Sequence, residues 1–171
     1  MNPLNALRTI KKLLTDAEIE ARAMGDAEPG AEHLLLAALD LPDGSARRAF
    51  ARLKIDPDTL RHAIVDQQAD ALVAIGFDAD QARTLSAAAP LDPPTGTGVY
   101  RSAVSAQEAF QAAAALAAKD GPFSLIGAHV VIAVAGMEHG TAARVLSRVG
   151  ADRDALASAA RQEINDTRAT A

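Results

Sequence analysis

Apolar residues recur along this chain at the three- and four-residue spacing of α-helices, not at the alternating spacing of β-strands. The first segment shows this clearly, because Asn2 and Pro3 make a good helix start and Gly25 a helix end. The apolar positions between them are Leu4, Leu7, Ile10, Leu14, Ala17 and Ala21. Nearly every later segment has the same periodicity, which predicts an all-α fold.

The next segments predict three more helices. Residues 31–41 should form a short buried helix, since its Leu34–Leu36 run covers most of the helix circumference. Pro42–Gly44 predicts a turn, after which we expect Ser45 to cap a helix that runs to Leu53. A further helix should open at residues 56–57.

The second half of the chain predicts the same plan, with helices over about 102–119 and 129–137 and two more from about 141 and 152. Between the halves, residues 69–88 predict helix with an interruption at Gly76 and Asp78 as an N-cap. The proline- and glycine-rich stretch 90–98 predicts a linker, and the end after Ile164 should be frayed.

The chain repeats itself at a fixed offset. When the sequence is shifted by 96 residues, residues 13–64 align with residues 109–160 without a gap, and 13 of the 52 pairs are identical. Similar residues also align, such as the run Leu34–Leu36 with Val130–Ile132. A duplication of this kind predicts one helical unit built twice, with function at equivalent surfaces or in the seam between the units.

Composition excludes several classes of protein. The chain has 171 residues, a net charge of −5 and no cysteine, so a disulfide framework and a thiolate metal site are excluded. No basic patch favours nucleic acid, and no apolar run is long enough for a membrane span or a signal peptide. We therefore expect a cytoplasmic protein that binds neither nucleic acid nor membrane. Arginine outnumbers lysine 13 to 4, which suggests a bacterial GC-rich genome.

Recognisable catalytic motifs are absent from the sequence. It contains no Walker-type phosphate loop, no Gly-x-Ser-x-Gly elbow and no His-Glu-x-x-His pair, so we expect no enzyme, no cofactor and no metal site. His33 and His129 are equivalent under the 96-residue shift. They are either a pair of ligands or bases, or structural residues whose ring nitrogens satisfy loop backbone groups, and the second interpretation is favoured.

The segment Ala31-Glu32-His33-Leu34-Leu35-Leu36-Ala37-Ala38-Leu39 is preceded by Gly25 and followed by Gly44-Ser45 and Ile55-Asp56. In this order it resembles the Clp N-terminal domain, or Clp repeat, family. The resemblance implies two tandem four-helix repeats with pseudo-twofold symmetry in a single domain over residues 1–171. Repeat 1 would span about 2–66, the insert and linker about 67–100, and repeat 2 about 101–165.

The resemblance also implies a function. Domains of this family stand in front of AAA+ unfoldases such as ClpA and ClpC, where they receive substrates and adaptors. We therefore expect a stand-alone, non-enzymatic adaptor, competitor or decoy of the Clp protease system, without the ATPase module. It would bind peptides, degradation-marked and arginine-phosphorylated proteins, or cyclic peptide antibiotics. The alternative is a regulatory partner that binds a ClpC-type unfoldase directly and never binds substrate.

The same resemblance implies binding residues. Glu32 and Ala31 match the family's phosphoarginine motif, with alanine in place of threonine, whereas Ala128 replaces the acid in the second unit. A carboxylate suits the planar guanidinium group. Leu4 and Tyr100 align where the family has an apolar groove, with Glu108 at its edge. Tyr100 could instead fix the linker onto the next helix.

Overall fold

The computed structural model of the chain describes residues 3–86, 102–121 and 125–170. These residues form nine helices and contain no strand, which confirms the all-α prediction. The helices are α1 (Pro3–Ala23), α2 (Ala31–Leu39), α3 (Ser45–Arg52), α4 (Thr59–Ala74), α5 (Ala79–Ser86), α6 (Val104–Lys119), α7 (Gly127–Ala135), α8 (Thr141–Arg148) and α9 (Arg153–Ala169). None of these helices is long and apolar enough to cross a membrane.

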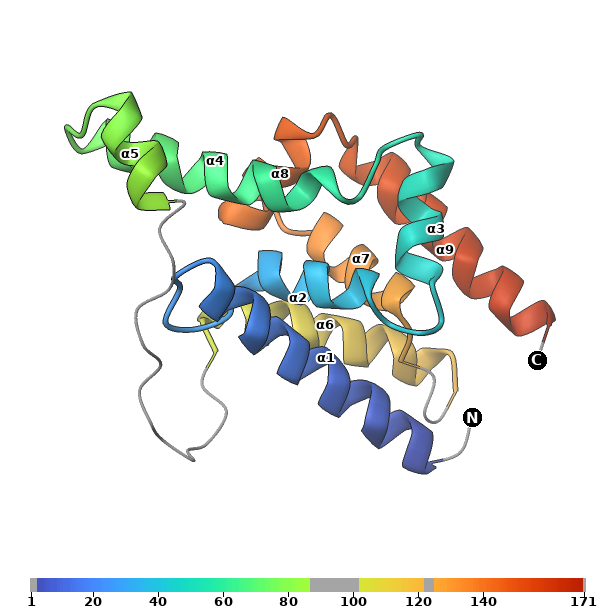
Figure 1. Cartoon of the computed structure of the whole chain (residues 1–171). Coiled ribbons are helices and arrows are strands. Elements are labelled where there is room, and N and C mark those ends of the chain that lie inside the picture. The colour runs from blue at the N-terminus through green and yellow to red at the C-terminus, as the bar shows by residue number, and fades with distance from the viewer. Residues whose placement is uncertain (1–2, 87–101, 122–124, 171) are drawn as a thin grey trace.

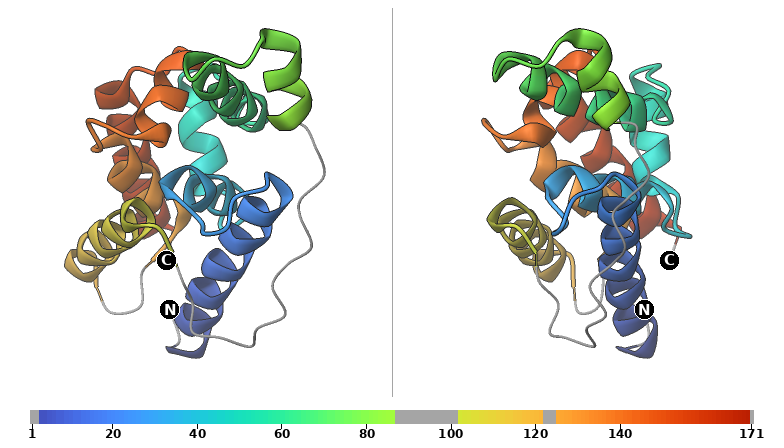
Figure 2. Two further views of the ribbon diagram at one scale, coloured as in Figure 1. Left: turned by 90° about the vertical axis from the view of Figure 1, so that its left-hand side faces the viewer. Right: turned by 60° about the vertical axis from the view of Figure 1, so that its left-hand side comes forward.

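The helices α2 and α7 lie at the centre and contact each other (Figure 1). Helix α1 packs on α2 and α6 packs on both central helices, so both lie on one side of the central pair (Figure 2). The helices α3, α4, α8 and α9 lie on the other side. The result is a three-layered arrangement with two short, strongly apolar helices inside.

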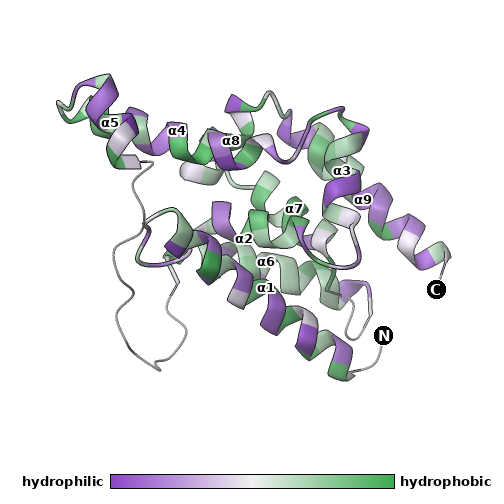
Figure 3. Ribbon diagram, viewed as in Figure 1, coloured by the Kyte–Doolittle hydropathy of each residue, from purple (hydrophilic) through white to green (hydrophobic). Residues whose placement is uncertain are grey.

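The apolar sequences of α2 and α7 explain their central place. All nine residues of α7 and all of α2 except Glu32 are buried, and both helices are strongly hydrophobic in Figure 3. A helix that is apolar all round must be covered on every side. The outer helices α3 and α8 instead bury one apolar face and pair it with an arginine-rich face.

The bounds of several helices follow the 96-residue offset. Helices α2 and α7 have the same length and are displaced by 96 residues, and so are α3 and α8. Helix α5 lies within the predicted insert, and Asp78 Oδ1 accepts hydrogen bonds there from the amides of Asp80 and Gln81, as an N-cap should. The predicted linker 90–98 lies outside the described residues. The symmetry of the two units stays a prediction.

Residues 69–74 are helical, as predicted, and form the last turns of α4. Two other local predictions were wrong. Ser45 does not cap α3, because it is the first residue of that helix and its hydroxyl accepts from the Ala128 amide of α7 at 2.8 Å. The end of the chain is not frayed after Ile164, since α9 continues to Ala169.

A buried carboxylate joins α9 to α3. Glu163 is only 2% exposed, and it accepts hydrogen bonds from Arg48 Nε at 2.5 Å and Arg52 Nε at 2.6 Å. Burial alone would raise the pKa of Glu163, but the hydrogen bonds and charges of the two arginines outweigh it and leave the pKa below its ordinary value. The ionised form is therefore favoured in the folded protein.

The lowered pKa of Glu163 predicts how stability depends on pH. Its contribution should be fully present above about pH 4.3, the ordinary glutamate pKa, and be lost as the pH falls through the lower folded value. Denaturant unfolding between neutral and acidic pH should show Glu163→Gln less stable near neutrality, with the gap narrowing as the pH falls. Glu18→Gln, which removes the charge of a partly exposed glutamate paired with Arg22, is the control. A constant gap would contradict this prediction.

Candidate functional site

The N-terminus of α2 opens into a pocket of about 350 Å³ that faces the start of α8. The pocket is therefore built from segments about 110 residues apart in sequence, one in each half of the chain. Its lining residues are Asp26, Glu28, Gly30, Ala31, Glu32, Gln68, Ala103, Ser105, Met137, His139, Gly140, Thr141, Ala142 and Arg144. We call this the Glu32 pocket.

Glu32 occupies the floor of this pocket. Its side chain is 13% exposed and folds back over Gly30, where a Cβ would lie 2.3 Å from Glu32 Oε1. The lack of a side chain at Gly30 therefore makes room for the carboxylate. No lysine or arginine of the described residues pairs with Glu32, and His33 Nδ1 lies 3.5 Å from its Oε1. A carboxylate that has no cation beside it can accept one from a ligand.

The buried His33 fixes the entry to α2. Its Nδ1 accepts a hydrogen bond from the Gly30 amide at 3.0 Å, so the hydrogen of the neutral ring must be on Nε2. That Nε2 lies 3.2 Å from Asp26 Oδ2. His129 repeats the first of these bonds, since its Nδ1 accepts from the Ile126 amide at 3.1 Å. Its Nε2 is hydrogen-bonded to Asp120 Oδ2 at 2.9 Å, whereas the buried His33 Nε2 makes no hydrogen bond with Asp26. These bonds support the structural interpretation of both histidines.

The same bonds argue against a metal site here. Asp26, Glu32 and His33 form the one group in the described part of the chain whose side chains could gather around an ion. A metal needs a free nitrogen lone pair, and a ligating histidine donates its other N–H to an acceptor. His33 has the opposite arrangement, because its Nδ1 is itself an acceptor and its Nε2 carries the hydrogen. The cluster is therefore better described as a helix cap with a carboxylate behind it.

The equivalent end of α7 is closed by the protein itself. Both carboxylate oxygens of Asp43 lie within 3.3 Å of the Gly127 amide, and Ser45 Oγ accepts from the Ala128 amide. Under the 96-residue shift, His139 and Thr141 replace Asp43 and Ser45 at the Glu32 pocket. Among the described residues, neither of these two side chains makes a recorded hydrogen bond to the N-terminus of α2. At α2 a single longer bond takes the place of those at α7, from the Ala31 amide to Ser105 Oγ at 3.3 Å, so the first site is more open than the second.

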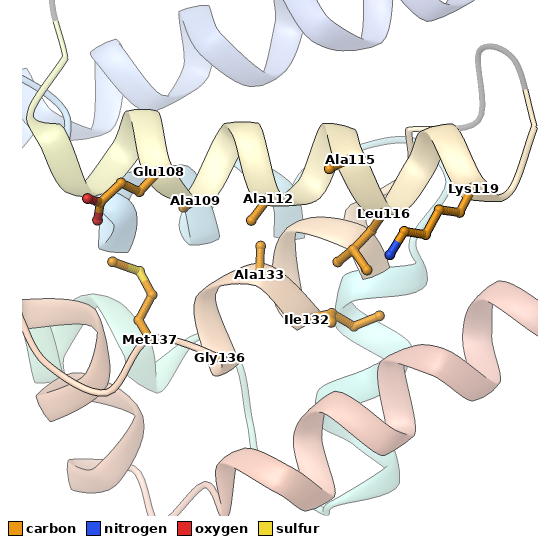
Figure 4. A pocket seen from close by; sticks show the side chains of 10 residues that line it. All are labelled: Glu108, Ala109, Ala112, Ala115, Leu116, Lys119, Ile132, Ala133, Gly136 and Met137. Atoms are coloured by element: carbon orange, nitrogen blue, oxygen red, sulfur yellow. The ribbon is translucent and has the colours of Figure 1, made fainter.

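Of the five predicted binding residues, the structure brings Ala31 and Glu32 together in one pocket. Leu4 lies on α1 with 64% of its surface exposed, away from that pocket. Tyr100 lies outside the described residues. Glu108 lines a different cavity, a groove of about 500 Å³ between α6 and α7 (Figure 4). The predicted grouping of Leu4, Tyr100 and Glu108 around one groove is therefore untested.

Sequence reasoning missed Arg144 and Thr141, which line the Glu32 pocket from α8. Arg144 makes no ion pair with another described residue, so its charge is available to a ligand. The 96-residue alignment pairs Arg144 with Arg48, which binds Glu163, and Thr141 with Ser45. That pairing was the available signal, but nothing in the sequence says that α8 faces α2.

Comparison with known proteins supports the resemblance. Residues 8–89 match the family model described as Clp repeat (R) N-terminal domain, which is just under half of the chain. No curated protein matches. One similar solved structure comes from an investigation of a malarial protein secretion system, at 18% identity and a TM-score of 0.60, with 94% of each chain covered.

A second similar structure is the N-terminal domain of the caseinolytic protease associated chaperone ClpD from Arabidopsis thaliana. It is 22% identical, with a TM-score of 0.55, and the match covers 93% of this chain and 94% of that one. At these identities the two structures show the fold alone. They extend it, however, well beyond the segment that the family model matches.

Domains of this family are binding domains that receive protein substrates and adaptors for Clp unfoldases, and no enzymatic family matches the chain. The 171 residues contain no ATPase module. The predicted resemblance is therefore confirmed: residues 8–89 belong to the Clp repeat N-terminal domain family, and the chain has the fold of Clp N-terminal domains.

Proposed function

We propose that this chain is a non-enzymatic binding protein of the Clp protease system that recognises peptides or degradation-marked proteins at the Glu32 pocket. It would act there as an adaptor, a competitor or a decoy. The observation that carries the proposal is the open pocket itself. Glu32 lies on its floor without a cationic partner among the described residues, while the equivalent helix end at α7 is filled by Asp43 and Ser45.

The chemistry of the pocket favours an arginine-type side chain. A guanidinium group can bind a carboxylate through two parallel hydrogen bonds, and Glu32 offers both oxygens. Phosphoarginine carries a phosphate next to that group, and Arg144 and Thr141 on the facing helix could bind it. Asp26 and Glu28 in the same lining oppose the phosphate, so the balance between the unmodified and the phosphorylated side chain is a question for experiment.

Apolar contacts would add to this polar anchor. The outer face of α1 exposes Leu4 and Leu7, each at 64% of its surface. Exposed leucines on one helix face can bind the apolar side chains of a peptide or of a cyclic peptide antibiotic. We include Leu4 and Tyr100 in the proposed surface on this ground and on the family resemblance.

A calorimetric titration with phosphoarginine and with an arginine-containing peptide tests the pocket. We expect saturable binding of at least one ligand and a loss of about tenfold or more in Glu32→Gln, because a charge-assisted hydrogen bond is replaced by a neutral one. Glu138→Gln is the matched control, since Glu138 is exposed and does not line the pocket. It should bind like the wild type.

The outcomes separate the possible functions. Equal binding by wild type and Glu32→Gln would place the site elsewhere. If neither ligand nor a cyclic peptide binds, the substrate-binding proposal is wrong. A pull-down that then returns a ClpC-type unfoldase would favour the alternative, a regulatory partner that binds the unfoldase directly.

A further inference from the structure

The groove between α6 and α7 is separate from the Glu32 pocket and apolar along most of its length. Its walls include Leu116 of α6, Ile132 of α7, and Met137, which follows α7 (Figure 4). Small residues lie between them, such as Ala112 and Ala133, so a partner could approach closely. The groove encloses about 500 Å³, the largest volume among the cavities described here.

The two ends of the groove carry opposite charges. Glu108 lies at one end and Lys119 at the other, both on α6 (Figure 4). They are eleven residues apart, which is about three helical turns or 16 Å, so they share one face of α6. Within the described residues neither side chain takes part in a recorded ion pair. The groove therefore offers two unsatisfied charges at a fixed separation.

The corresponding positions in the first half of the chain carry ion pairs. Under the 96-residue shift, Leu116 corresponds to Glu20, which is buried and accepts a hydrogen bond from Arg61 Nη2 of α4 at 2.5 Å. Glu108 corresponds to Lys12, which is paired with Asp16 at 2.5 Å.

In the second half these partners are gone. Asp16 and Arg61 are replaced by Ala112 and Ala157. The substitutions therefore leave an apolar surface on which Glu108 lacks the helix partner that Lys12 has. Lys119 aligns with Ala23, so it is a charge that the first half lacks. Unpaired charges at both ends of an apolar surface are what we would expect if the second unit binds something there.

We infer that this groove binds an amphipathic helix of a partner protein. The helix would present an apolar face with an acidic residue opposite Lys119 and, eleven positions later, a basic residue opposite Glu108. Helix-in-groove recognition uses apolar anchors on successive turns, and the groove spans about three of them. Eleven residues are close to three full turns, so both partner charges lie on the face that contacts the groove.

The order of the charges follows from helix dipoles. A partner helix that runs antiparallel to α6 places its N-terminus near Lys119 and its C-terminus near Glu108. Antiparallel dipoles attract, and an acidic residue near a helix N-terminus and a basic residue near its C-terminus stabilise the partner helix itself. The acidic residue therefore comes first in the partner's sequence.

The test uses two synthetic helical peptides of about four turns with capped ends. Both have the same apolar face, but the forward peptide has glutamate first and arginine eleven positions later, and the reversed peptide has the two exchanged. We expect the full chain to bind the forward peptide about tenfold more tightly in a fluorescence titration, since two ion pairs become two repulsions. The double variant Glu108→Lys with Lys119→Glu should prefer the reversed peptide.

Two tryptophan variants, one inside the groove and one outside it, test whether the peptide binds in the groove. Ala112→Trp should weaken binding of the forward peptide by about tenfold or more, because Ala112 lines the groove. Ala118→Trp should not, because Ala118 is exposed on the same helix but outside the groove. Both positions are exposed, so both variants should fold, which circular dichroism checks.

Several results would overturn the inference. They are equal binding of both peptides by the wild type, no binding of the forward peptide, or equal effects of the two tryptophans. Sedimentation of the protein alone tests another occupant. A dimer that Ala112→Trp dissociates would mean that a second copy of this chain covers the groove. Because Glu32→Gln should leave peptide binding here unchanged, this test and that of the Glu32 pocket can fail independently.

Discussion

Replacing Phe50 by alanine is expected to lower the free energy of unfolding by about 3–5 kcal/mol. Phe50 is fully buried, and among the described residues it is the largest of the fully buried side chains. It lies on α3, which packs against α7 and α9 from the second half of the chain. Its removal would leave a cavity among helices from both halves, and rigid helices collapse into such a space only in part.

This loss is large beside the total stability of a domain, about 5–15 kcal/mol. Urea unfolding followed by circular dichroism measures it. Phe110→Ala is the matched control, because it removes the same atoms from a partly buried position on α6 that packs at the margin of the core. We expect a clearly smaller loss there. Equal losses at the two positions would mean that burial in the interface between α3 and the second half does not determine the cost.

The apolar layer of this fold was predictable because its signal is local. The run Leu34–Leu36 and its counterpart Val130–Ile132 leave no polar face, so any fold of this chain has to bury both helices. The structure places them against each other at the centre. Helix ends marked by proline or glycine were also predictable to within about two residues.

Polar contacts between distant segments were not predictable from local signals. Ser45 has the sequence context of an N-cap, yet its hydroxyl binds the Ala128 amide, 83 residues away. Glu163 lies between Gln162 and Ile164 in a segment rich in polar residues, and its burial depends on two arginines from α3. Such groups are placed by the packing of whole helices, which a local pattern does not contain.

The candidate site was predictable in part. Glu32 came from the family resemblance, and the structure adds that its pocket is open and that the equivalent end of α7 is closed. Arg144 could not be predicted, because its place opposite Glu32 follows from how α8 packs on α2. Of the residues that line the groove between α6 and α7, only Glu108 was named from the sequence, because the others resemble an ordinary alanine-rich helix face.

Alanine at Gly127 is expected to lower the free energy of unfolding by about 1–3 kcal/mol, the usual cost of overpacking. Gly127 begins α7 where the helix meets both α2 and α3. A Cβ there would lie 2.9 Å from the Ala38 carbonyl oxygen and 2.9 Å from Ala46 Cβ. Neither neighbour can rotate away, since one is backbone and the other is fixed to a helix. The helices themselves would have to separate.

The same substitution at the entrance to α2, Gly30→Ala, should affect ligand binding and not stability. The new Cβ would also be too close to an atom, but that atom is Glu32 Oε1 at 2.3 Å, at the end of a side chain that can rotate. We expect stability close to that of the wild type and weaker binding of phosphoarginine or an arginine peptide, because the carboxylate is pushed from its place. Urea unfolding and calorimetry of both variants measure the two effects. If Gly30→Ala unfolds as readily as Gly127→Ala, Gly30 has a structural role in the entry to α2. If Gly30→Ala binds the ligands like the wild type, the folded-back position of Glu32 does not determine ligand affinity.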